Sequence, residues 1–180
     1  MILALSTCLT ACRDSGEPPL VAEDILRLNS EANQVAIGLK HYVTSEGIRR
    51  AYVEADTAFF IESKGLVELS VLQVTFFNGI GDTTSVLTSS EGTYDWNTGD
   101  MTATENVVVV NPRKGRRVET SVLYYNRSED RIWSDAATKM FEADGTVVEG
   151  TAFESNSGME QVNLTSARAV SPGARQQPVQ

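Results

Sequence analysis

The chain has 180 residues, a formal net charge of −9 and 22% charged residues, which suits one acidic domain with terminal tails. This charge argues against nucleic acid as a partner, because binding to phosphate backbones depends on basic side chains. The single histidine, His41, and the two cysteines, Cys8 and Cys12, leave the rest of the chain without the residues for a zinc site or a disulfide framework.

The first twelve residues, MILALSTCLTAC, are mostly apolar and end in Leu9, Thr10, Ala11 and Cys12. That ending resembles the lipobox of bacterial lipoproteins, in which small residues precede a cysteine that is acylated and becomes the mature N-terminus. We therefore predict Cys12 as a lipidation site, although the segment is short and no Lys or Arg precedes it. The other interpretation is a truncated signal or anchor whose cysteines have no role. Residues 13–34, which include two prolines, predict a solvated tether.

From residue 35 to residue 170 the chain is typical of a β domain, since runs of β-branched and aromatic residues alternate with turns rich in Asn, Gly and Asp. Because the turns are short, successive strands pair antiparallel. Residues 171–180 hold two prolines and three glutamines and predict a disordered tail. The predicted strands cover residues 35–44, 48–61, 66–77, 87–110 around a turn at 97–100, 116–126, 131–141, 146–154 and 159–169.

One pattern recurs along these strands, in which a large, a small, a second small and an aromatic residue are spaced by two, three and two positions. Strict alternation keeps side chains on one face, so the step of three predicts a bulge or sharp twist. If the repeated residues face inward, their small members leave room for a ligand; the alternative is an ordinary sandwich core in which facing large residues fill the gaps. The copies are Val53, Ala55, Ala58 and Phe60; Leu87, Ser89, Gly92 and Tyr94; Val118, Thr120, Leu123 and Tyr125; and, in part, Leu164, Ser166 and Ala169.

No residue pattern of an enzyme is present. His41 lies in a predicted strand among Leu39, Lys40 and Tyr42, away from any nucleophile motif, and no glycine-rich loop precedes a helix. We therefore predict a protein without catalytic residues, metal or cofactor. One basic cluster stands out in this acidic chain, and it predicts either contact with anionic lipid headgroups or a charged hairpin turn. Its members are Arg113, Lys114, Arg116 and Arg117.

Five segments, in this order, resemble the LptC family, the periplasmic component of lipopolysaccharide export, and its LptA and OstA-like relatives. The resemblance spans about residues 35–169 and implies an all-β fold, one long twisted antiparallel sheet bent into a β-jellyroll or "β-taco" with an apolar groove. It also implies that lipid A acyl chains lie in that groove and that no catalytic residues exist. The segments are AYVEADTAFF at 51–60, VTFFNGIG at 74–81, residues 87–111, residues 117–133 and GTAFESNSGM at 150–159.

The resemblance implies lipopolysaccharide as the ligand, LptF and LptG of the inner-membrane transporter as partners, and an LptA-like carrier as the next protein. We predict a membrane-anchored position on the periplasmic side of the inner membrane, with lipid passed toward the outer membrane. The alternative is a jellyroll-type binding or structural lipoprotein, glycan-binding or adhesive. The predicted groove residues are Val53, Ala55, Phe60, Leu87, Tyr94, Val118, Leu123 and Tyr125.

Two further expectations concern position. We expect Phe60, Tyr94, Leu123 and Tyr125 to lie near one another along the floor of the groove. We also expect the last strand, residues 159–169, to be an exposed edge that pairs with the carrier, while residues 35–42 at the opposite edge contact the transporter.

Overall fold

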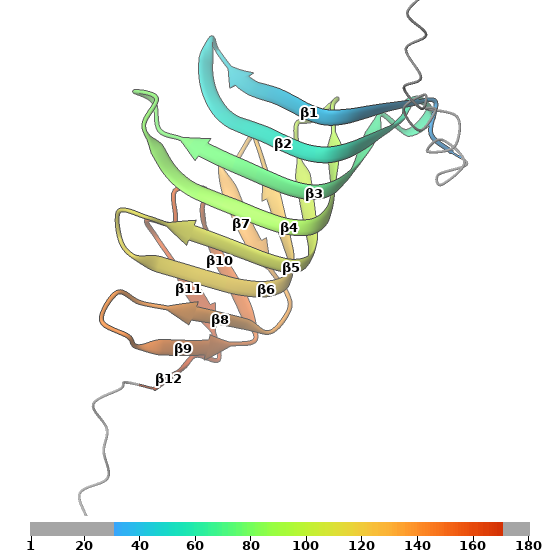
Figure 1. Ribbon diagram of the computed structural model, residues 1–180. Helices are drawn as coiled ribbons and strands as arrows, with labels where there is room; N and C mark the ends of the chain where they lie inside the picture. The colour runs from blue at the N-terminus through green and yellow to red at the C-terminus, as the bar shows by residue number, and fades with distance from the viewer. Residues whose placement is uncertain (1–30, 171–180) are drawn as a thin grey trace, which may run out of the picture.

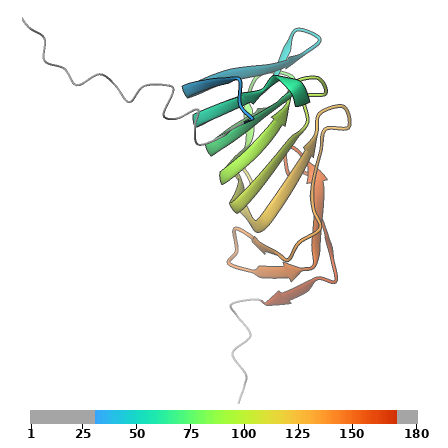
Figure 2. The same cartoon turned by 90° about the vertical axis from the view of Figure 1, so that its right-hand side faces the viewer.

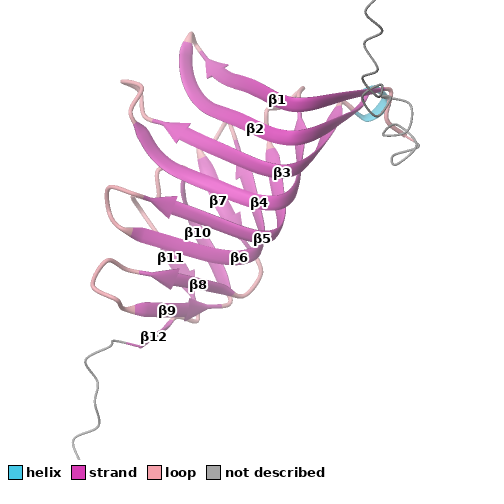
Figure 3. Cartoon of the chain, in the orientation of Figure 1, coloured by secondary structure: helices cyan, strands magenta, loops and turns pink. Residues whose placement is uncertain are grey.

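The computed structural model describes residues 31–170, which form one antiparallel sheet of twelve strands and a single short 3₁₀ helix, η1 (Figure 3). Within this part of the chain, no helix is long and apolar enough to cross a membrane. The elements are β1 Gln34–Ser45, β2 Ile48–Ile61, η1 Glu62–Lys64, β3 Leu66–Phe77, β4 Thr83–Asp95, β5 Met101–Asn111, β6 Arg116–Asn126, β7 Arg131–Ser134, β8 Thr138–Phe141, β9 Val147–Gly150, β10 Ala152–Asn156, β11 Asn163–Thr165 and β12 Arg168–Val170.

Strands β1 to β6 are long, lie side by side, and each bends in its middle (Figure 1). The bend follows a line across the sheet where the pairing skips a residue or slips its register. Gly38 and Val71 have φ values of 66° and 53° on this line, and Glu105 and Asn106 have 60° and 54°. This left-handed backbone reverses which side of the strand the next side chain occupies. The line coincides with the three-residue steps of the repeat, so the predicted bulge is confirmed.

The bend divides the sheet into two facing walls. The front wall holds the half of β6 that pairs with β8, through Arg117–Phe141 and Val118–Met140, and continues into β9 and β12. The rear wall holds the other half of β6, which pairs with β7 through Tyr124–Trp133, and continues into β10 and β11. Figures 1 and 2 place β1 at one end of the stack and the C-terminal strands at the other.

The division into walls corrects three predicted strands. Residues 131–141 were expected as one strand but form β7 and β8 on opposite walls, with a corner in which Thr120 Oγ1 lies 2.9 Å from Ser134 Oγ. Residues 146–154 likewise split into β9 and β10, and residues 159–169 into β11 and β12. Continuous β-prone sequence cannot show such a split, because it depends on which wall each strand joins.

The apolar side chains of both walls meet between them and form one core. Leu123, Ile132 and Val109 are at most 1% exposed, so the C-terminal part of the interior is packed. In β4, Gly92 shows why the repeat needs a small residue at this position. A Cβ on Gly92 would lie 2.6 Å from Leu72 Cδ2 and 2.9 Å from the Thr102 carbonyl oxygen. The space left by this glycine is filled by a neighbouring side chain, as in a close-packed core.

Candidate functional site

The eight predicted groove residues all belong to the interior between the walls. Six of them are buried, with at most 5% of their surface exposed, and the remaining two, Phe60 and Tyr94, are half-buried and pack against the core. The six are Val53, Ala55, Leu87, Val118, Leu123 and Tyr125. That these side chains contact lipid stays a prediction.

At the β1 end the interior is not filled and contains a cavity of about 400 Å³. Leu39, His41 and Val53 line it from the front wall, and the rear wall supplies the rest. The His41 ring lies 5.9 Å from Tyr94, and the Phe60 ring lies 6.3 Å from Trp96. A cavity of this size with mainly aliphatic and aromatic walls suits an apolar ligand. The rear-wall residues are Phe60, Val67, Leu69, Tyr94 and Trp96.

Of the predicted groove residues, this cavity brings together Val53, Phe60 and Tyr94. Leu123 and Tyr125, expected beside them on one floor, are not among its lining residues, and Tyr125 instead packs against Phe76 with ring centroids 5.1 Å apart. Repeat position alone cannot separate the cavity from the packed core, because both lie on the same inner face.

Four residues that line the cavity were not among the predicted groove residues: Leu39, Val67, Leu69 and Trp96. The first three alternate with polar residues in their strands, which gave a signal for the inner face. Trp96 was predicted as part of the strand before the turn at 97–100, but it lies after β4, in the turn to β5. His41 lies in β1, as predicted, and is exposed while contributing to the cavity wall.

The two inward tyrosines carry no charge near neutral pH. Burial raises the pKa of Tyr125 to about 12, and it also raises the pKa of Tyr94. Their hydroxyl groups therefore stay protonated. Among the described residues, no group of three or more His, Cys, Asp or Glu side chains could hold a metal ion.

A segment that we call the strap, residues 157–160, crosses from the end of β10 to the front wall. It covers part of the opening between the two walls, which we call the mouth. Ser85 Oγ donates to the Ser157 carbonyl oxygen, and Asn111 Nδ2 donates to that of Gly158 at 2.8 Å. Arg116 and Lys114 donate to the next two carbonyl oxygens, each at 3.2 Å. Met159 is fully buried, so the strap closes the C-terminal part of the interior from the side.

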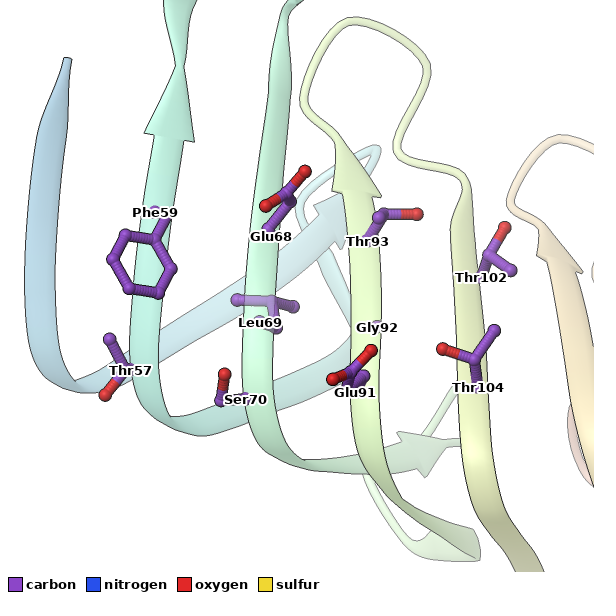
Figure 4. Close-up of a pocket in the computed structure, with 10 residues that line it drawn as sticks. All are labelled: Thr57, Phe59, Glu68, Leu69, Ser70, Glu91, Gly92, Thr93, Thr102 and Thr104. Atoms are coloured by element: carbon purple, nitrogen blue, oxygen red, sulfur yellow. The ribbon is translucent and has the colours of Figure 1, made fainter. Parts of the chain in front are cut away.

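A larger depression of about 590 Å³ lies on the outer face of the rear wall (Figure 4). Its side chains are chiefly hydroxyls and carboxylates from neighbouring strands, and Thr57, Ser70 and Glu91 lie in one cross-strand row. Leu69 turns toward the interior cavity, which it also lines. With its carboxylates and hydroxyls, this surface suits an acyl chain less well than the interior cavity does. The lining residues are Thr57, Phe59, Glu68, Leu69, Ser70, Glu91, Gly92, Thr93, Thr102 and Thr104.

The basic cluster forms ion pairs within the fold. Arg113 pairs with Asp82 at 2.8 Å across neighbouring hairpin turns. Arg116 and Arg117 pair with Glu142 and Glu119 at 2.8 and 2.7 Å. These contacts favour the charged hairpin turn over a headgroup site. Cys12 and the predicted tether, apart from its last residues, lie outside the described residues.

Comparison with known families identifies the chain. A family model described as "Lipopolysaccharide-assembly, LptC-related" matches residues 1–170. The chain belongs to this LptC-related family. The LptC and LptA transport proteins are non-enzymatic, which confirms the prediction of a non-catalytic protein, and the chain is a component of lipopolysaccharide transport. Comparison with the curated proteins gives no match.

Among solved structures, this LptC-related chain is similar to LptH, described as the LptA homologous periplasmic component of the conserved lipopolysaccharide transport device from Pseudomonas aeruginosa. The TM-score is 0.52 at 16% sequence identity, and the match covers 67% of this chain and 93% of LptH. The likeness confirms the predicted fold, an LptA-like β-jellyroll built from a long antiparallel sheet that is not closed.

Proposed function

We propose that this chain accepts lipopolysaccharide extracted from the inner membrane and holds its acyl chains between the two walls, on the way to the outer membrane. The observation that supports this most is the apolar cavity at the β1 end, where the two walls stay apart. Each methylene group moved there from water is favourable by about 0.8 kcal/mol. An acyl chain can therefore be held without any specific chemistry.

The same proposal places the chain on the periplasmic side of the inner membrane, held by a lipid on Cys12 or by another N-terminal segment. LptF and LptG would meet the edge strand β1, whose twelve residues pair only with β2 among the described strands. Because an open strand edge presents unpaired backbone groups, a transporter strand can extend the sheet there. The cavity then lies next to the contact that delivers the lipid.

An LptA-like carrier would pair with the opposite edge. On the rear wall this edge is β11, three residues long, and not the longer strand expected from the sequence. Thr165 accepts a hydrogen bond from the Thr151 amide at 3.0 Å, so it faces back toward β10. Alternation along the strand then turns the amide of Leu164 outward, where a carrier strand can bond to it.

The carrier contact is tested by replacing Leu164 with proline, which removes the outward amide but none of the bonds to β10. We expect carrier binding to be lost while binding to LptF and LptG persists. Leu164→Ala is the matched control, because it removes the side chain and keeps the amide. Carrier binding that survives in a folded Leu164→Pro protein would show that this edge is not the contact.

Lipid binding is tested with photo-crosslinking residues at Phe60 and Tyr94, which line the cavity, and at Glu54 and Glu119, whose side chains form ion pairs with Lys40 and Arg117. We expect lipopolysaccharide to crosslink at the first two positions and not at the other two. Equal crosslinking at all four would rule out a ligand confined between the walls.

A further inference from the structure

The mouth between the walls contains a second cavity of about 400 Å³, distinct from the apolar one. Its front side is formed by the turns after β1 and β3, with Arg50 and Asn78, and its rear side by Tyr125 and Arg127 at the end of β6. The strap forms its remaining side.

Arg50 is turned into this mouth by a bulge. The register moves from Val43–Ala51 to Thr44–Arg49, which leaves Arg50 without a partner on β1. Arg49 stacks its guanidinium 4.4 Å from the centre of the Tyr42 ring, beside Tyr52 on the outer face. Since successive side chains of a strand alternate, Arg50 occupies the other side.

Arg127 reaches the mouth from the rear wall. Its amide donates to Asp100 Oδ1 at 2.9 Å, and its side chain lies against Gly99, where an added Cβ would be 2.6 Å from Arg127 Cδ. Gly99 has a φ of 80°, so both the turn and the close approach require glycine there. The β4–β5 turn thus positions this arginine.

The two arginines are half-buried, and neither forms an ion pair with another described residue. Four other arginines each pair with a carboxylate within 4.0 Å: Arg113, Arg116, Arg117 and Arg131. Burial raises the pKa of Tyr125, and the negative charge of Asp130 adds to that rise, while the positive charges of Arg127 and Arg50 act against it. Arg127 acts in the same way on Tyr94, which lines the apolar cavity. Both arginines also line the same cavity as Tyr125.

Acidic groups also face the mouth. Glu46, Asp130 and Glu160 line it, but all three are exposed, so solvent screens them more than the half-buried arginines. Asp100 is already engaged by two donors, the Arg127 amide and Asn126 Nδ2. Because the two arginines are the less exposed charges, an anion beside them is favoured, while the exposed rim is acidic.

We propose that Arg50 and Arg127 bind the phosphoryl group of an amphiphile whose acyl chain occupies the neighbouring apolar cavity. The proposal rests on the proposed function, since it assigns the headgroup of the lipid held there. A guanidinium presents a planar set of N–H donors that matches phosphate oxygens, and two of them from opposite walls would hold the group between the walls. The headgroup would stay at the mouth because charged oxygens do not enter an apolar cavity.

The test is a calorimetric titration of the full chain with two lipids of equal acyl length, a lysophosphatidic acid and the corresponding monoacylglycerol. We expect the phosphorylated lipid to bind about tenfold more tightly or better, as one charge-assisted hydrogen bond already provides. The double variant Arg50→Gln and Arg127→Gln should bind both lipids equally. The matched control, Arg117→Gln with Arg131→Gln, changes the net charge equally and should keep the preference.

The outcomes separate the two proposals. If the wild type binds both lipids equally well, the phosphoryl site is wrong while acyl binding stands. If it binds neither, the proposed function itself fails. If inorganic phosphate alone binds as tightly as the phosphorylated lipid, or if the control variant also loses the preference, the arginines do not recognise a lipid headgroup. Far-UV circular dichroism of each variant checks that it is folded.

Discussion

A carboxylate placed between the two walls should reduce stability in the packed core but reduce lipid binding in the apolar cavity. Leu123 is 1% exposed in the packed core, whereas Leu39 is half-buried in the wall of the apolar cavity. Leu123→Asp removes roughly 1.5–3 kcal/mol of side-chain burial and adds about 2 kcal/mol or more for an unpartnered polar group. The sum, roughly 4 kcal/mol or more, approaches the lower end of the stability of a domain, about 5–15 kcal/mol. We expect this variant to be severely destabilised.

Leu39→Asp should instead remain folded, because water reaches β1 at the edge of the sheet, and should lose lipid. The expected cost in stability is about 1 kcal/mol. Urea unfolding followed by circular dichroism measures the stability, and titration with an acyl lipid measures binding. Ile37→Asp is the control, since Ile37 is 64% exposed on the same strand and should keep both properties. A folded Leu123→Asp protein that has lost lipid would refute the packed core and favour an open groove through Leu123.

Three further predictions concern single positions. Because the pKa of Tyr125 rises from 10.0 to about 12 on folding, its stabilising effect is present below pH 10 and is lost as pH rises through 12; Tyr125→Phe should remove roughly 2 kcal/mol of pH dependence in urea unfolding measured between pH 9 and pH 12. Gly92→Ala should destabilise the sheet by about 1–3 kcal/mol through its clash with Leu72, whereas Gly79→Ala, with nothing within 4 Å, should not change the unfolding midpoint in that way. Cys12→Ala, expressed in a Gram-negative host, should leave the membrane fraction; retention of this variant in that fraction would exclude Cys12 as the anchor.

The bend was predictable because it repeats within the sequence. At the bend, the next inward-facing side chain comes three positions later instead of two. That step occurs in each complete copy of the repeat, as from Ala55 to Ala58. The corners at Asp135 and Ser166 were not predictable in this way. They depend on the pairing of β8 and β12 with the front wall, a long-range choice that neither alternation nor composition carries.

The division of the interior into a cavity and a packed core could not be predicted either. Phe60 and Tyr125 occupy equivalent places in their repeats, yet one lines the cavity and the other packs against Phe76. The strap also differs between the two ends, since its Met159 is buried in the core. Likewise, Arg50 faces the mouth because of one extra residue in β2, and no residue pattern marks that bulge.

The two ends of the sheet are therefore physically different, and this bears on direction. The β1 end combines a cavity with a long edge that pairs with no second strand among the described residues, so a ligand and a partner strand could arrive there together. The other end is closed from the side by four hydrogen bonds to the strap and by a buried methionine. An acyl chain held at the β1 end can advance only if core side chains or the strap move aside, which costs free energy that the groove does not itself supply. Under the proposed function, onward transfer would then be driven by what happens at the ends: delivery of the next lipid at β1 and pairing of a carrier at β11.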